Sequence, residues 1–295
     1  MASSVLITML LVTAFPTVTA AEEAADGKPP VTVRLLPIQT AVEPGETCIV
    51  GVHLEMADGW HVYWKNPGQA GLPTRVEWTL PQGFRAGPLR WPVPKRFTMP
   101  GRITAFGYAG EVVLITLIRL PDDLGDRKQV TLKAKVSWLA CNGTCVPGQA
   151  TVRLRLPVAA EGTPANRRRF RAWLDRLPRT PSDPGHPLEV SLDRSGGEQP
   201  GGRYTLTLTW AEPVTDVEWF PVPGPAVELN DVAVGADGRR ATITFAAAVL
   251  QGHELDRETM ECIVAYTDAQ GRRRGVRVDV PLVAAKANEP KPATP

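Results

Sequence analysis

The stretch QVTLKAKVSWLACNGTCVPGQATVRLRLPV, residues 129–158, contains two runs of alternating apolar and polar residues around a short polar segment. Alternation of this kind is typical of β-strands that bury one face. The dipeptide Asn142-Gly143 lies between the two runs, and it readily adopts the left-handed backbone of a tight turn. We therefore predict an antiparallel hairpin with Cys141 and Cys145 at or near its end.

The same alternation recurs before this hairpin, in short runs separated by turn segments that contain proline or glycine. About seven such strands within residues 30–158 favour an antiparallel β-sandwich. The predicted strands are 31–38, 47–56, 59–65, 74–80, 111–120, 129–140 and 150–158.

A second series of alternating runs covers residues 186–284 and predicts another sandwich. Between the two series, apolar residues at helical spacing in 163–178 predict a short connecting helix, which Pro178 ends. Residues 285–295 show no periodicity, and we expect a disordered tail. The predicted fold class is all-β, with two antiparallel sandwiches joined by a short helical linker.

Residues 1–20 have the features of a signal peptide. The apolar core Val5–Phe15 is too short to span a bilayer, and small residues at Val18 and Ala20 predict cleavage before Ala21. No later segment approaches the ~20 apolar residues of a membrane span. We expect a soluble exported protein in an oxidising compartment, where disulfides persist.

The overall composition is that of a globular chain of about two domains, with 295 residues of which 43% are hydrophobic and 22% charged. The net charge of +2 is too small to indicate binding to nucleic acid or to an anionic membrane. The sequence has no zinc-protease, P-loop or serine-hydrolase motif, and its four histidines are widely spread.

The four cysteines fall into two groups. Cys48 and Cys262 each alternate with apolar residues, so we expect two buried thiols, and a bridge between them is the alternative. The spacing of Cys141 and Cys145 is compatible with a redox-active pair, a structural disulfide or a metal site. A disulfide across so short a loop contributes only about 2 kcal/mol of stability, against nearly 5 for a loop of 100 residues. Short exposed bridges are also the more exchangeable ones.

Four motifs, in this order, resemble the N-terminal periplasmic domain of the DsbD/ScsB family of thiol:disulfide interchange proteins. They are ADGWHVYWKNPGQAGLP (57–73), WPVPKRF (91–97), FGYAGEVVL (106–114) and C-x3-C-V-P (141–147). The resemblance covers residues 30–158 and implies an immunoglobulin-like fold in the periplasm. The ScsB branch carries two such domains, which agrees with the two predicted sandwiches.

The resemblance also implies a mechanism, in which a membrane-embedded donor passes reducing equivalents through the cysteine pair to periplasmic thioredoxin-like or disulfide isomerase proteins. By position, Cys145 forms the mixed disulfide and Cys141 resolves it. The pair carries both electrons, so we expect no cofactor. Because the sequence shows no membrane span, we expect the donor to be a separate protein.

Three further residues match positions around the pair in this family: Phe97 in a cap loop, with His61 and Tyr63 flanking the cysteines. The sequence departs from the family where acidic residues precede the cap aromatic, because Lys95 and Arg96 stand there. We expect these cations to favour a thiolate. The alternatives are a Cu(I) site formed by both cysteines and His61, and a structural interaction module with a static disulfide.

Overall fold

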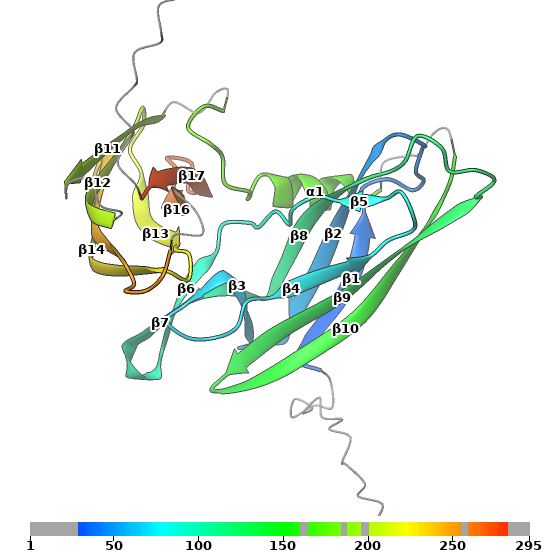
Figure 1. Ribbon diagram of the computed structural model, residues 1–295, viewed down its shortest axis with the longest axis horizontal. Coiled ribbons are helices and arrows are strands. Elements are labelled where there is room, and N and C mark those ends of the chain that lie inside the picture. The colour runs from blue at the N-terminus through cyan, green and yellow to red at the C-terminus, as the bar shows by residue number, and fades with distance from the viewer. Residues whose placement is uncertain (1–28, 160–164, 184–187, 196–200, 255–258, 283–295) are drawn as a thin grey trace, which may run out of the picture.

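The computed structural model describes residues 29–159, 165–183, 188–195, 201–254 and 259–282. Within these ranges the chain forms antiparallel sheets, one α-helix and one short 3-10 helix. The sheets form two immunoglobulin-like sandwiches that lie side by side (Figure 1). The predicted signal peptide (1–20) and tail (285–295) lie outside the described residues.

The first sandwich packs a four-stranded sheet, β1-β2-β8-β5, against a six-stranded sheet, β10-β9-β3-β7-β6, in which β4 also pairs with β9. All seven strands expected in this half are present. The strands are β1 (Val31–Pro37), β2 (Thr47–Met56), β3 (His61–Gly68), β4 (Arg75–Thr79), β5 (Arg85–Ala86), β6 (Lys95–Met99), β7 (Ile103–Ala109), β8 (Glu111–Arg119), β9 (Gln129–Asn142) and β10 (Thr144–Pro157).

The second sandwich joins a four-stranded sheet, β11-β12-β15-β14, to a three-stranded sheet, β13-β16-β17. Its strands are β11 (Leu188–Ser195), β12 (Gly201–Trp210), β13 (Thr215–Val222), β14 (Val227–Asp237), β15 (Arg240–Val249), β16 (Thr259–Thr267) and β17 (Arg273–Pro281). Each strand lies within the second series of alternating runs. Most of these strands bury one face in the core between the sheets, whereas β14 is exposed beyond Leu229.

The linker helix is shorter than the predicted 163–178. Helix α1 spans Arg167–Leu174, and residues 163 and 164 are not described. Asn166 has a left-handed backbone (φ 53°), which ends the helix on its N-terminal side. After Leu174 the backbone hydrogen bonds change from the α-helical i−4 acceptor to the i−3 acceptor. The amide of Leu177, for example, donates to the carbonyl of Leu174.

Helix α1 covers the outer face of the four-stranded sheet. Phe170 packs so closely on β2 that a Cβ at Gly51 would lie 3.1 Å from its Cζ atom. Arg169 forms an ion pair with Glu111, which also bonds the buried His53. The helix is therefore part of the first sandwich rather than a free spacer. It is neither long nor apolar enough to cross a membrane, and the described residues contain no other α-helix.

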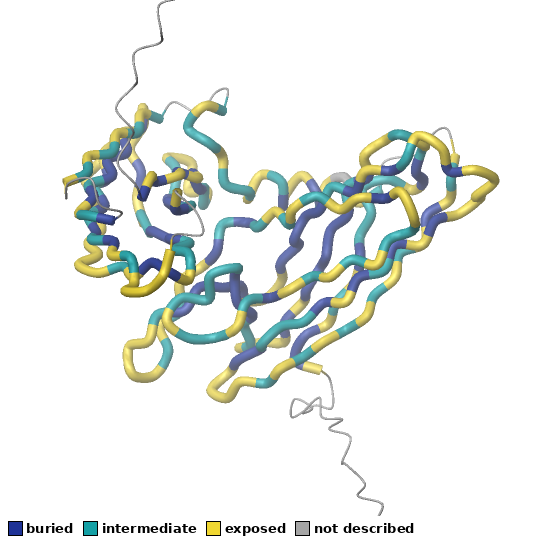
Figure 2. The backbone as a smooth tube through the Cα atoms, viewed as in Figure 1, coloured by how far each residue is buried: buried dark blue, intermediate teal, exposed yellow. Residues whose placement is uncertain are grey.

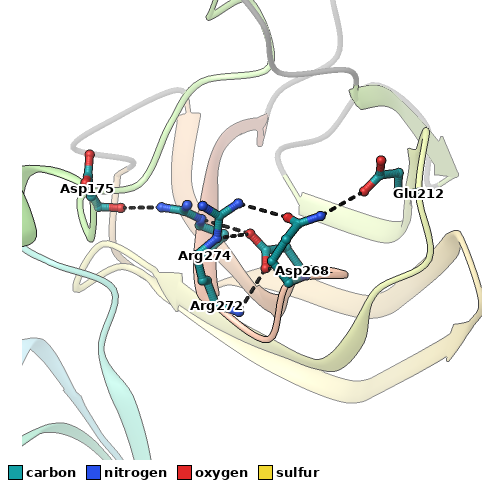
Figure 3. Close-up of polar contacts among 6 residues, drawn as sticks. Asp175, Glu212, Asp268, Arg272 and Arg274 are labelled. Carbon is teal, nitrogen blue, oxygen red and sulfur yellow. Dashed lines mark hydrogen bonds and ion pairs between the residues drawn. The ribbon is translucent and has the colours of Figure 1, made fainter.

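The two sandwiches share an apolar contact. Phe220 from β13 packs edge-on against Phe106 from β7, with the ring centroids 5.0 Å apart. Polar contacts surround it, including an ion pair between Lys65 on β3 and Glu261 on β16. Figure 3 shows a further contact, in which Arg274 donates to the carbonyl oxygen of Asp175 just after α1. The second sandwich thus contacts the sheet that carries the cysteine pair at strands β3 and β7.

Cys48 and Cys262 are both free and buried, as the alternation predicts. They belong to different cores, one in each sandwich, and no bridge joins them. Burial raises the pKa of the Cys48 thiol to about 11 and raises that of Cys262 as well. Neither thiol is placed for exchange chemistry.

Candidate functional site

Cys141 and Cys145 form a disulfide at the end of the β9–β10 hairpin. The two residues face each other directly across the strands, and Gly143 makes the turn with a left-handed backbone (φ 72°). Their Cα atoms are 4.1 Å apart. This is slightly closer than the usual range of about 4.4–6.8 Å, because directly opposed residues of a tight hairpin are already adjacent.

The two sulfur-bearing residues differ in exposure. Cys141 is 1% exposed and lies in a small apolar cluster, whereas Cys145, the second residue of β10, is exposed. Figure 2 shows the tips of the β9–β10 and β6–β7 hairpins as exposed segments at the same end of the sandwich. An incoming thiolate therefore finds one accessible residue of the pair, Cys145, while its partner is shielded.

Strand β3 places His61 and Tyr63 beside the disulfide. His61 is the residue opposite Cys141 in the β3–β9 pairing, and Tyr63 lies two positions further on the same face. The Tyr63 hydroxyl is 3.2 Å from the Sγ atom of Cys141. A disulfide sulfur carries no proton, so the hydroxyl is the donor. On the opposite face of β3, Val62 and Trp64 enter the main core.

Tyr63 is fixed from two sides. A Cβ at Gly71 would lie 2.2 Å from the Cε1 atom of the ring, so only glycine allows the 66–73 loop to pass so closely. The Sγ of Cys141 and the Sδ of Met99, 3.8 Å away, both face the hydroxyl. Burial raises the pKa of Tyr63, which keeps the hydroxyl protonated and able to donate at neutral pH.

Phe97 lies over the same site. Its ring stacks on the imidazole of His61 with centroids 4.7 Å apart and an interplanar angle of 15°. The segment expected to be a cap loop is a strand hairpin, made of β6, the 3-10 helix η1 (Pro100–Arg102) and β7. Gly101 and Arg102 both have positive φ, of 78° and 62°, and together they turn the chain at its tip.

The imidazole of His61 is unusual because its Nε2 atom is buried without a hydrogen-bond partner. Burial lowers the pKa of His61, so the ring is neutral at pH 7 and can accept or donate one further hydrogen bond. Unpaired buried nitrogens are uncommon, and their presence next to a functional group calls for a physical explanation.

The expectation that Lys95 and Arg96 act on the cysteines is wrong for Arg96. Successive residues of a strand point to opposite faces, so Phe97 faces the disulfide and Arg96 faces the second sandwich. Arg96 pairs there with Glu218, 3.5 Å away. Lys95 is exposed and lines a cleft beside α1.

A family model and solved structures place this geometry in context. The model for the N-terminal part of the thiol:disulfide interchange protein DsbD matches residues 32–157, from β1 to the end of β10. Residues 32–157 are a DsbD N-terminal domain. This membership supports a thiol:disulfide interchange role for the Cys141–Cys145 pair. No curated protein sequence matches the chain.

The crystal structure of the N-terminal periplasmic domain of ScsB from Proteus mirabilis covers 85% of this chain and 92% of its own length, with 18% identity and a TM-score of 0.57. That likeness extends the shared fold from the DsbD N-terminal domain over the second sandwich. A structure of the YadV chaperone covers 83% of this chain at 10% identity, but its TM-score of 0.22 is too low for a comparison.

The DsbD N-terminal domain brings together all five predicted site residues: Cys141, Cys145, Phe97, His61 and Tyr63. Sequence reasoning missed Met99, Ala105 and Leu139, which complete the apolar cluster around Cys141. Met99 follows Phe97 by two positions in β6, so both side chains lie on the same face of the strand. Treating 95–99 as a loop hid that periodicity.

A metal site has less support from this geometry. Both sulfurs are bonded to each other here, and the described part of the chain contains no group of three or more metal-ligating side chains. His61 faces the phenyl ring of Phe97, which is not a ligand.

Proposed function

We propose that this protein is an exported thiol:disulfide exchange relay, which takes reducing equivalents from a membrane-embedded thiol donor and passes them to periplasmic thioredoxin-like or disulfide isomerase proteins. The observation that carries this proposal is the unequal exposure of the two cysteines of the disulfide. Cys145 is exposed, while Cys141 is buried beside a hydroxyl donor.

Delivery of electrons then has two steps. In the reduced protein, the Cys145 thiolate attacks one sulfur of the partner's disulfide, and the other partner sulfur leaves as a thiolate. The Cys141 thiolate next attacks the Sγ of Cys145, and the partner cysteine leaves as the second thiolate. The Cys141–Cys145 disulfide forms again, and the partner has gained two electrons.

Reduction by the donor runs the other way. A donor thiolate attacks Cys145, the accessible sulfur, and the Sγ of Cys141 departs with the electron pair. The Tyr63 hydroxyl is 3.2 Å from that atom and donates to the developing negative charge. A second donor thiolate then attacks the donor sulfur of this mixed disulfide, which closes the donor's own disulfide and releases Cys145 as a thiolate, so that both cysteines are reduced.

Phe97 protects the pair between partners. Its ring rests on His61 and packs against the cluster around Cys141, so it restricts the approach to the disulfide to the Cys145 side until a docking partner moves it. Movement of Phe97 also exposes the unpaired Nε2 of His61, which then meets either water or a polar group of the partner. The cap therefore favours proteins that can displace it over small oxidants.

The experiment that tests this function is a pair of single-cysteine traps. The Cys141→Ser protein retains the exposed Cys145 thiol and should accumulate mixed disulfides with thioredoxin-like proteins, because it has no resolving cysteine. The Cys145→Ser protein is the matched control and should accumulate few. Equal trapping by both variants, or by neither, would contradict the relay.

A further inference from the structure

The strand that carries Phe97 has a neighbour on one side only. Strand β6 is the last strand of the sheet order β10-β9-β3-β7-β6, and its backbone pairs with β7 alone. Edge strands of five residues are held weakly by their own hydrogen bonds. Side-chain contacts on the other side of β6 therefore have a large share in fixing where Phe97 lies.

Those contacts come from the second sandwich. Arg96, next to Phe97 in the chain, donates through Nη2 to the carbonyl oxygen of Trp219 at 3.3 Å. Its Nε lies 3.5 Å from Oε1 of Glu218. The guanidinium also lies 5.5 Å from the ring centroid of Phe106 and 6.0 Å from that of Phe220. The face of β6 opposite Phe97 is thus bound to the second sandwich by charge and by stacking.

Glu218 makes a second connection to the base of the same strand. Its Oε2 atom pairs with Arg273 on β17 at 2.7 Å. Arg273 in turn donates to the carbonyl oxygen of Pro94 at 2.8 Å, just before β6 begins. One carboxylate therefore organises two arginines that hold residues on either side of Lys95.

A bulge in β13 directly precedes Glu218 and sets the direction of its side chain. The pairing of β13 with β16 is irregular between Thr215 and Glu218, and Asp216 has a left-handed backbone (φ 50°). Bulges of this kind re-aim the side chains that follow them. The side chain of Glu218 is 26% exposed, so its ion pairs are screened less than pairs on an open surface.

We propose that Glu218 is a positioning residue for the Phe97 cap, and that the second sandwich in this way controls access to the Cys141–Cys145 disulfide. The inference rests on the proposed function, because a cap matters only for a disulfide that exchanges. It assigns a task to the second sandwich, which holds no disulfide of its own among its described residues. Loss of the carboxylate removes the ion-pair partner that Arg96 and Arg273 share and loosens β6, so that Phe97 leaves His61 more often.

The test compares Glu218→Ala with Glu261→Ala in the full oxidised chain. Glu261 is a matched control, because it also joins the sandwiches through an ion pair but reaches Lys65 on β3 rather than the cap strand. The measurement is the second-order rate constant for reduction by dithiothreitol, followed by trapping of free thiols. We expect Glu218→Ala to react at least threefold faster than wild type, and Glu261→Ala to stay within 1.5-fold.

Two further measurements separate positioning from general loosening of the fold. Both variants should unfold in a single transition, and Glu218→Ala should melt at the lower temperature, since it loses its pair with Arg273 within the second sandwich as well as its interdomain pair with Arg96. The equilibrium constant with glutathione should stay within twofold of wild type, because the cap covers the oxidised and the reduced pair alike. In an Arg96→Ala/Glu218→Ala double variant the rate should match the faster single variant rather than the product of both effects.

The inference is overturned if Glu218→Ala reacts at the wild-type rate, or if Glu261→Ala accelerates reduction equally. Failure of the relay itself would show differently, as absence of mixed disulfides from the Cys141→Ser trap, whatever the ratio of these rates.

Discussion

The hydroxyl of Tyr63 lies 3.2 Å from the Sγ of Cys141, the shielded sulfur of the disulfide. This single contact links strand β3 to the chemistry of the β9–β10 hairpin, because Cys141 is the sulfur that must leave when a thiolate attacks Cys145. The donor is held in place before the charge develops, so no reorganisation is needed at that moment.

Replacing Tyr63 by phenylalanine should slow reduction of the disulfide by dithiothreitol roughly tenfold, since a hydrogen bond to a charged group contributes about 1.5 kcal/mol. Tyr108→Phe is the control, because it also removes a buried hydroxyl, one that donates to the carbonyl of Pro92 at 2.7 Å. Equal rates in wild type and Tyr63→Phe would remove the hydroxyl from the mechanism.

Replacing Phe97 by alanine should speed the same reaction at least threefold, because the ring no longer covers His61 and the pair behind it. Ile103→Ala is the matched control, since Ile103 starts β7 on the same hairpin, is 38% exposed and lies outside the cluster around Cys141. If both variants react alike, the hairpin as a whole rather than the Phe97 ring limits access.

The reduced native protein should react with iodoacetamide quickly at the exposed Cys145, more slowly at the shielded Cys141, and not at Cys48 or Cys262. Burial raises the pKa of Cys48 to about 11 and also raises that of Cys262, so neither supplies a thiolate near pH 8. Mass spectrometry should find two added groups in the folded protein and four after denaturation. A third group on the folded protein would show that one of the cores opens.

The stability of the fold should fall as the pH drops from 7.5 to 5. Burial lowers the pKa of His61 below its ordinary value, so the unfolded chain binds this proton at a higher pH than the folded protein does. Protonation therefore favours unfolding as the pH falls through that range. The pKa of His53 is lowered too, by burial first, so part of the dependence remains without His61.

Urea unfolding of His61→Phe at several pH values checks this point. The variant should lose less stability than wild type between pH 7.5 and 5. Parallel curves for the two proteins would mean that His61 is protonated equally easily in the folded and the unfolded chain.

Much of the fold follows from alternation alone, because both sandwiches bury one face of nearly every strand. Strands β5, β6 and β7 were not predicted. Strands β5 and β6 have only two and five residues, and Pro100-Gly101 breaks the pattern between β6 and β7. The predicted helix is longer than α1 because the periodicity continues past Leu174, where the backbone already turns.

The candidate site was only partly accessible from the sequence. The cysteine spacing left three kinds of site open, and the neighbours of the pair came from the family resemblance. The direction of Arg96 could not be predicted, because a sequence pattern does not say which sandwich will cover the far side of an edge strand. The link from Glu218 to the cap joins residues more than 100 positions apart, so it required the structure.

The measurement that tests the central claim most directly is the reduction potential of the Cys141–Cys145 pair, determined by equilibrating the protein in glutathione buffers and trapping free thiols. A relay requires a potential among those of exchange proteins, roughly −120 to −270 mV, and we predict a value in that range. A potential below about −300 mV would mean a disulfide that resists the glutathione pool, which would contradict the relay and leave a structural bridge.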